Sequence, residues 1–214
     1  MRPPSALQRY AGRTVLAVGA HPDDVEVGMG GTVARLTGLG VNVLVVAVCV
    51  PSRFSVRVEE ARRASEILGA RFELLRSQGC CRVEDAKTHE LVAEFDRLIR
   101  EHQPAAFFAH GPADTHKDHR LVFEAFQAAL RVGGVDAYCY QPCTCRPGRT
   151  RFAPQAFVDI EETLPRKLAA IEAHYSQFGE RGMTAEFQRD LARYYGRQAG
   201  CAYAEGLEVV HLSL

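Results

Sequence analysis

The chain has 214 residues, of which 47% are hydrophobic and 24% are charged, and its formal net charge is zero. This length and apolar content predict one globular domain, residues 1–214, with a full hydrophobic core. Neutral charge without a basic run argues against nucleic acid or an anionic membrane as partner. No stretch approaches the roughly 18 apolar residues of a membrane span, so we expect no transmembrane segment.

Residues 1–12 lack the apolar core of a secretory signal, which favours a cytoplasmic protein. Seven cysteines, an odd number, contain no Cys-x-x-Cys pair, so reduced and packed thiols are the better interpretation. A structural zinc site built from Cys139, Cys143 and Cys145 is the alternative, although their spacing matches no common thiolate site.

The first unit of the chain combines an apolar run, a polar turn and a glycine-rich segment. The run starting at Thr14 predicts a strand, and His21-Pro22-Asp23-Asp24 forms a polar turn after it. Gly28, Gly30 and Gly31 then lead into a helical pattern opened by Thr32. The order is strand, loop, helix.

Strand and helix patterns then alternate along the chain. The continuous apolar run Val41–Val50 is typical of a parallel strand that is covered on both faces. The next expected elements are a helix at Val58–Leu68 ended by Gly69, a short strand at Phe72–Leu75, a helix at Thr88–His102, a strand at Ala105–Ala109, a helix at Leu121–Leu130 and a strand at Val135–Tyr140.

The last third starts with a break in this rhythm. Three prolines in Gln141–Pro154 predict a surface excursion near the site. A strand at Phe157–Ile160 and helices at Leu164–Tyr175 and Ala185–Gln198 follow. The alternation predicts an α/β fold, a Rossmann-like doubly wound and mainly parallel sheet with helices on both faces.

Two polar loops follow apolar strands and therefore meet at one edge of this sheet. The first contains His21, Asp23 and Asp24. The second holds three histidines and two aspartates within ten residues, His110, Asp114, His116, Asp118 and His119. Together the loops offer one metal site and a spare acid/base pair.

His21, Asp24 and His119 are the candidate metal ligands. Two imidazoles and one carboxylate leave positions open for water, as in catalytic zinc sites. The same set describes the facial triad of non-haem iron oxygenases, and spacing alone does not separate them. The alternative for each residue is a polar loop with a satisfied side chain. Asp23 is either a general base beside the metal or a turn or helix-cap residue.

These residues resemble the PIG-L/LmbE family of metal-dependent N-acetylglucosaminyl deacetylases. The likeness rests on His-Pro-Asp-Asp with a following Gly-Gly-Thr, on Asp-x-His-x-Asp-His, and on further segments through most of the chain. Those segments are Arg57-Val-Glu-Glu-Ala, Phe157-Val-Asp-Ile, Ser176-Gln177-Phe178 and Gly196-Arg-Gln-Ala-Gly200-Cys-Ala-Tyr203-Ala-Glu205-Gly206. The motifs are nearest to the branch that deacetylates N-acetylglucosaminyl malate in bacillithiol synthesis.

The resemblance implies a hydrolase of linear amides, using zinc, or Fe²⁺ or another divalent metal. Its substrate is a small glycoside with a 2-acetamido group, and Asp23 is the base. His116 pairs with Asp118, whose carboxylate orients the imidazole and favours its charged form, so that His116 stabilises the oxyanion. Arg57 and Asp114 are expected to contact substrate, and the alternative for Arg57 is an exposed arginine at the start of a helix. We also expect a homo-oligomer.

Departures from the family pattern leave the aglycone open. Val50-Pro51-Ser52-Arg53-Phe54 replaces a Thr-x-Gly-Glu segment, and Thr115 replaces an arginine that tends to occur in the malate branch. Three other functions fit the sequence less well. The βα alternation disfavours the jelly roll of iron oxygenases, the first loop lacks the Gly-x-Gly-x-x-Gly of a dehydrogenase, and a non-catalytic sugar-binding module has no need of Asp23.

Overall fold

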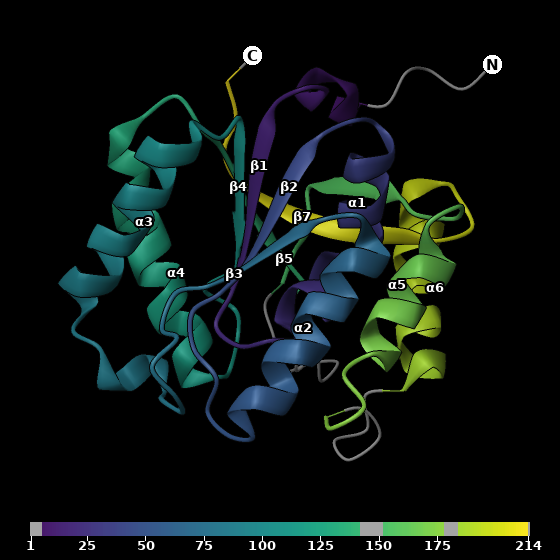
Figure 1. Cartoon of the computed structure of the whole chain (residues 1–214). Coiled ribbons are helices and arrows are strands. Elements are labelled where there is room, and N and C mark those ends of the chain that lie inside the picture. Colours follow the sequence, from purple (N-terminus) through teal and green to yellow (C-terminus); the bar gives the residue numbers. More distant parts are fainter. Residues whose placement is uncertain (1–5, 142–151, 178–183, 214) are drawn as a thin grey trace.

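The computed structural model describes residues 6–141, 152–177 and 184–213. A seven-stranded sheet lies at its centre, in the order β3-β2-β1-β4-β5-β7-β6 (Figure 1). The strands are β1 (Thr14–Gly19), β2 (Asn42–Ala47), β3 (Arg71–Leu74), β4 (Ala106–Ala109), β5 (Asp136–Tyr140), β6 (Ala156–Asp159) and β7 (Ala204–His211). The first five are parallel, whereas β7 runs antiparallel to both β5 and β6. The mainly parallel sheet expected from the sequence is confirmed.

Helices cover both faces of this sheet. They are α1 (Asp24–Gly38), α2 (Phe54–Leu68), α3 (Thr88–His102), α4 (Lys117–Ala129), α5 (Leu164–Glu172) and α6 (Ala185–Ala199). Figure 1 shows α3 and α4 on one face, with α1, α2, α5 and α6 on the other. The strand order reverses between β1 and β4, the place where ligands bind in open α/β sheets.

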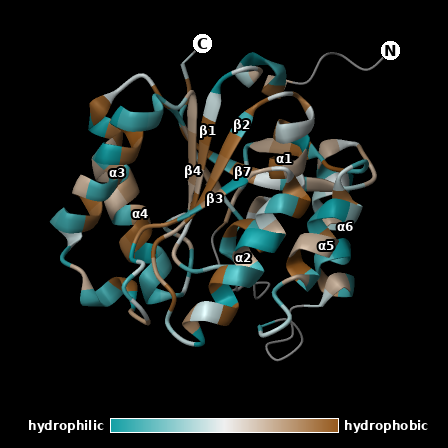
Figure 2. Ribbon diagram, viewed as in Figure 1, coloured by the Kyte–Doolittle hydropathy of each residue, from teal (hydrophilic) through white to brown (hydrophobic). Residues whose placement is uncertain are grey.

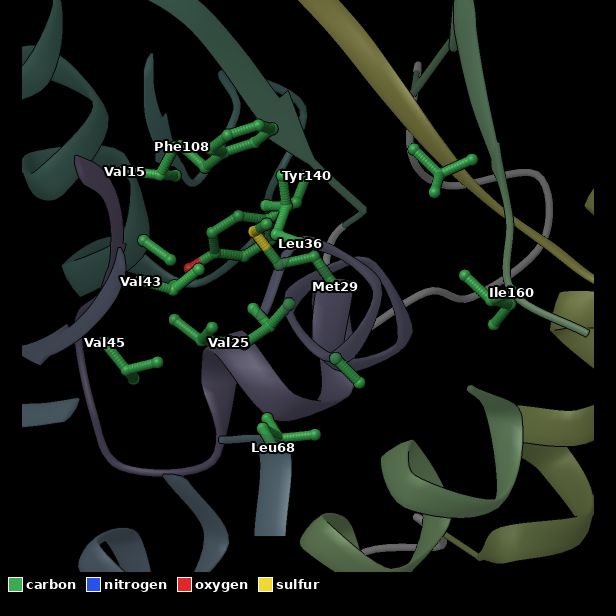
Figure 3. Packing of buried hydrophobic residues seen from close by; sticks show 14 of the residues in the cluster. Val15, Val25, Met29, Leu36, Val43, Val45, Leu68, Phe108, Tyr140 and Ile160 are labelled. Carbon is green, nitrogen blue, oxygen red and sulfur yellow. The ribbon is translucent and has the colours of Figure 1, made fainter. Parts of the chain in front are cut away.

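Alternate residues of each central strand enter two separate apolar clusters. In β1, Val15 and Ala17 pack on the α1 side, and Leu16 and Val18 pack on the α3 and α4 side. Both faces are therefore apolar, which is why the central strands are continuously hydrophobic in Figure 2. Figure 3 shows the first cluster, in which Phe108 and Tyr140 lie near Met29 of α1.

Helix α1 begins at Asp24, eight residues before the expected start at Thr32, and its backbone is broken at Met29 (φ −149°, ψ 23°). Three glycines surround this break because neighbours approach closely. A Cβ on Gly28 would lie 2.3 Å from the Tyr140 ring, and a Cβ on Gly31 would lie 2.8 Å from Ile160. These contacts explain why the segment reads as a loop in the sequence and is helical in the structure.

A buried ion pair binds the backbone groups that the break in α1 leaves without helical partners. The carboxylate of Glu205, on β7, accepts the N–H groups of Gly31 (3.0 Å) and Thr32 (2.6 Å). Lys167, on α5, donates to Glu205 at 2.5 Å and to the carbonyl of Val27 at 2.8 Å. The pair therefore satisfies backbone groups on both sides of the break. Both residues are 2% exposed.

Among the strands of the described residues, β7 alone is not predicted by the sequence pattern. Its pattern holds Glu205, Gly206 and Glu208 near the start, which weakens a strand prediction. Most of the expected excursion Gln141–Pro154, including Cys143 and Cys145, lies outside the described residues, so the three-cysteine zinc site stays a prediction. Among the described helices, none is long and apolar enough to cross a membrane.

Replacing Glu205 by Ala should lower the free energy of unfolding by about 3–5 kcal/mol, because it leaves a buried lysine charge without its partner. Urea denaturation measures the change. The matched control is Glu186→Ala on exposed α6 surface, for which a change within about 0.5 kcal/mol is expected. A loss at Glu205 no larger than that of the control would contradict the role of the pair.

Candidate metal centre and active site

The loop between β1 and α1 holds an unusual backbone. Asp23 occupies the N-cap position of α1 with φ 97° and ψ −27°, in the left-handed region that is costly for a residue with a Cβ. Its side chain makes no capping hydrogen bond. Instead, Asp24 accepts the N–H of His21 at 2.8 Å and pulls the loop into a tight turn. Asp23 is therefore at the N-cap position, but the interpretation that its side chain caps the helix is wrong.

His21, Asp24 and His119 converge as predicted. One ligand atom from each lies within 4.8 Å of the others. Nδ1 of His21 is 3.7 Å from one carboxylate oxygen of Asp24, and Nε2 of His119 is 3.4 Å from the other. Ligands about 2.1 Å from a tetrahedral zinc lie about 3.4 Å apart, so these separations suit one ion.

The outer nitrogens of both imidazoles bind carboxylates. His21 Nε2 lies 2.9 Å from Asp118, and His119 Nδ1 lies 2.7 Å from Asp114. Carboxylates at this position orient a metal-ligating histidine and make its other nitrogen a better donor. The three candidate ligands, and the two carboxylates that orient the imidazoles, thus suit a divalent cation.

These contacts correct two predictions from the sequence. Asp114 has a side chain that is 0% exposed, so it cannot be a substrate contact, and it holds His119. The Asp118 carboxylate binds His21 and the N–H of Val83 (3.4 Å), and no hydrogen bond to the His116 ring is formed by that carboxylate. The spacing of Asp-x-His-x-Asp-His brought the right residues together but did not reveal which imidazole each carboxylate faces.

The electrostatics of the triad favour a positive charge. Burial acts to raise the pKa of Asp24, but the imidazoles of His119 and His110 hold that pKa well below its usual range. Burial acts to lower the pKa of His119, but Asp24 and Asp114 raise it to about 9. A cation bound at Nε2 of His119, beside Asp24, would replace the proton on that nitrogen.

Asp23 lies beside the triad and is suited to proton transfer. Burial and the neighbouring Asp24 charge raise the pKa of Asp23 to about 6, while Arg57, His174 and His21 act to lower it. Its side chain is 13% exposed, so it reaches solvent from the edge of the buried site. A base with a pKa near the working pH is the efficient kind.

His116 is at the mouth of the site, with its ring 4.5 Å from that of His119 and 5.3 Å from that of His21. Its Nδ1 accepts the N–H of Asp118 at 3.2 Å, as the N-cap of α4. Burial and the charges of His119 and His21 lower its pKa. The charges of Asp118 and Asp24 act to raise the pKa, as expected for Asp118, but they do not offset the lowering. The neutral ring carries its proton on Nε2.

Arg57 also differs from its prediction. Its guanidinium is 5% exposed and donates to the carbonyl of Pro22 at 2.8 Å and to Asp23 at 3.4 Å. It therefore holds the loop and the candidate base from behind, and buried contacts within the protein take the place of the expected substrate contact.

Two histidines that the sequence left unassigned complete the surroundings. His110 stacks on His119 with ring centroids 3.9 Å apart, and burial and His119 lower its pKa to about 4. His174 is 1% exposed and lies 3.4 Å from Glu26 of α1. The apolar strand before His110 was the available signal, because it placed that residue at the same sheet edge.

Residues 16–130 match the family described as PIG-L: GlcNAc-PI de-N-acetylase. The chain belongs to this family. The diacetylchitobiose deacetylase of Thermococcus kodakarensis is 29% identical over 92% of this chain and 83% of its own length. The probable N-acetyl-alpha-D-glucosaminyl L-malate deacetylase 2 of Bacillus anthracis is 27% identical over 78% and 82%. This PIG-L protein is thus an N-deacetylase, and the resemblance seen in the sequence is confirmed.

The same architecture occurs in solved structures. The conserved protein TT1542 from Thermus thermophilus superposes with a TM-score of 0.79 at 28% identity, covering 94% of this chain and 95% of its own. This likeness covers more of the chain than the family match, which ends at residue 130, before β7 and the C-terminal helices begin.

The pKa of Asp23 should respond to Arg57. In metal-free protein, ¹³C NMR of the Asp23 carboxyl should show titration near pH 6, and Arg57→Met should move it to higher pH, because a positive charge that favours the carboxylate is lost. Arg57→Lys should move it less. The exposed Arg97 on α3 gives a control, Arg97→Met, that should leave it unchanged. Titration near the ordinary value of about 3.9 in the unmodified protein would contradict the assignment.

Proposed function

We propose that this PIG-L protein is a zinc-dependent hydrolase that removes acetyl from the 2-acetamido group of an N-acetylglucosaminyl-type small glycoside. The supporting observation is the convergence of His21, Asp24 and His119 at the end of β1 and β4, with Asp23 beside them. The bacillithiol pathway or a secondary-metabolite pathway is the proposed setting. Fe²⁺ or another divalent metal is the alternative to zinc.

His21, Asp24 and His119 would hold the ion. Bound there, zinc would supply Lewis acidity, lowering the pKa of water towards about 7 and polarising the amide carbonyl. Asp118 and Asp114 keep the two imidazoles in the tautomers and orientations that ligation needs. Zinc is proposed over magnesium because two of the three donors are imidazole nitrogens.

Asp23 is the proposed base. Its carboxylate takes a proton from the attacking water, and Arg57 holds both the carboxylate and the strained turn in place. His116 is the proposed oxyanion stabiliser. Because its Nδ1 accepts a backbone N–H, its Nε2 proton is directed away from α4 and can be donated to the developing oxyanion without the ring being charged. Asp23, which now carries the proton taken from water, then delivers it to the departing amine.

The relatives support the substrate class. The T. kodakarensis and B. anthracis proteins carry names with an N-acetylated sugar as substrate, and neither name decides the aglycone. The iron oxygenase using the same triad is disfavoured by membership of a deacetylase family. A single catalytic domain over residues 1–214, a cytoplasmic location and a homo-oligomer remain predictions from the sequence.

A mass-spectrometric screen tests this proposal. Purified protein loaded with zinc is incubated with N-acetylated glucosaminides that differ in their aglycone, including the malate conjugate, diacetylchitobiose and aminoglycoside precursors. Loss of one acetyl group and release of acetate is the expected result. No acetyl loss from any of these compounds by metal-loaded protein would overturn the proposed substrate class.

The metal assignment predicts stoichiometry. Purified protein, dialysed against a trace of zinc, should hold one tightly bound ion per chain, and His21→Ala or His119→Ala should lose it. Asp114→Asn should retain an ion with about 10–100-fold weaker affinity, because His119 loses its orienting carboxylate. His211→Ala, on an exposed strand end, is the control. Full metal content in both triad variants, measured by mass spectrometry, would end the assignment.

The neighbouring aspartates predict opposite phenotypes. Asp23→Asn should keep the metal and lose about 10²–10⁴-fold in rate of acetate release, because the base is gone. Asp24→Asn should lose the metal. Both variants remove one charge from the same turn, so each controls for the other. Near-normal turnover by Asp23→Asn would move the search for the base to His116.

A further inference from the structure

A cysteine borders the metal centre. Cys49 follows β2, has no exposed surface, and lies with His21 and Asp118 in a group whose ligand atoms are all within 4.8 Å of one another. This group shares His21 with the proposed zinc triad but uses different partners. No hydrolytic step described above needs a thiol.

The ring of His21 can serve both groups because its two nitrogens face different ways. Nδ1 lies towards Asp24, at 3.7 Å, and Nε2 lies 2.9 Å from Asp118. The proton between Nε2 and Asp118 is therefore where a second cation would lie. The thiol of Cys49 is the third donor and contacts the carbonyl of Ala20 at 3.6 Å.

We propose that Cys49, Asp118 and His21 Nε2 form a second cation site, selective for zinc or cadmium, whose occupation inhibits the enzyme. Thiolate, imidazole and carboxylate together suit these borderline and soft ions and do not suit magnesium or calcium. Binding releases two protons, one from Cys49 Sγ and one from His21 Nε2, and His21 then bridges two ions. No oxidation or reduction occurs.

The surroundings of Cys49 favour this role over that of a nucleophile. Burial raises the pKa of its thiol, and Cys81, Asp118 and Asp24 raise it further, so the free thiol stays protonated and unreactive. A bound cation is what ionises a thiol in such a place.

Inhibition follows from the contacts that the second ion takes over. Once the Nε2 proton of His21 is released, Asp118 would bind the second ion in its place, so His21 would lose the hydrogen bond that orients it for the first ion. Two positive ions on one imidazole also repel each other. Excess zinc should therefore slow the enzyme. This inference rests on the proposed triad for the first ion, and its test keeps the two sites apart.

Cobalt distinguishes the sites, because only a thiolate ligand gives a near-ultraviolet charge-transfer band with Co²⁺. Metal-free protein titrated with Co²⁺ should bind two ions per chain by equilibrium dialysis and develop that band. Cys49→Ser should bind one ion and show no band. His119→Ala should lose the first ion and keep the band. Cys201→Ser, a half-buried cysteine after α6, should behave as the unmodified protein.

A direct measurement covers the case in which Cys49→Ser fails to fold. ¹¹³Cd NMR of unmodified protein with two equivalents of cadmium should show one resonance typical of nitrogen and oxygen ligands and one shifted by sulfur. In activity assays, the rate with excess zinc relative to that with one equivalent should fall in unmodified protein and stay constant in Cys49→Ser. Absence of both the band and the sulfur-shifted resonance would overturn the second site. If the unmodified protein shows the sulfur-ligated ion but no second ion with nitrogen and oxygen ligands, only the triad assignment is overturned.

Discussion

The burial of the Asp24 carboxylate among imidazoles is the interaction on which the site depends. Side chains from two loops form one alternating row of acid and base, Asp118, His21, Asp24, His119 and Asp114, with neighbouring charged atoms 2.7–3.7 Å apart. Each of the three carboxylates lies beside an imidazole, so these carboxylates can be buried in a low-dielectric environment in which a lone carboxylate would be costly. The row explains why all five residues are buried and why a cation fits at its centre.

The sequence predicted the larger part of this arrangement because its signals are local. Apolar runs at Thr14 and Ala105 gave the strands, helix Thr88–His102 was predicted with its observed bounds, and parallel strands bring their carboxyl ends to one edge. His21, Asp24 and His119 are placed near one another because they follow two adjacent parallel strands that end at this edge. No side-chain geometry is needed to place them near one another.

What the sequence could not predict is set by contacts between distant segments. Arg57 reads as an exposed helix residue, but the chain around it turns so that its guanidinium is buried under Pro22 and Asp23. Asp118 follows His116 closely in sequence, yet the helical start of α4 directs the two side chains to different partners. Strand β7 was missed because the burial of Glu205 depends on Lys167, which is 38 residues away.

The ion pair at the break of α1 also sets an order of events during synthesis. Gly31 and Glu205 are separated by 174 residues, and among the described residues no nearer side chain accepts the N–H groups that Glu205 accepts. While the ribosome is still making the middle of the chain, β1, β2 and β4 can already associate, but α1 must wait with its second half uncapped. The second half of α1 can therefore be capped only once β7 has been synthesised.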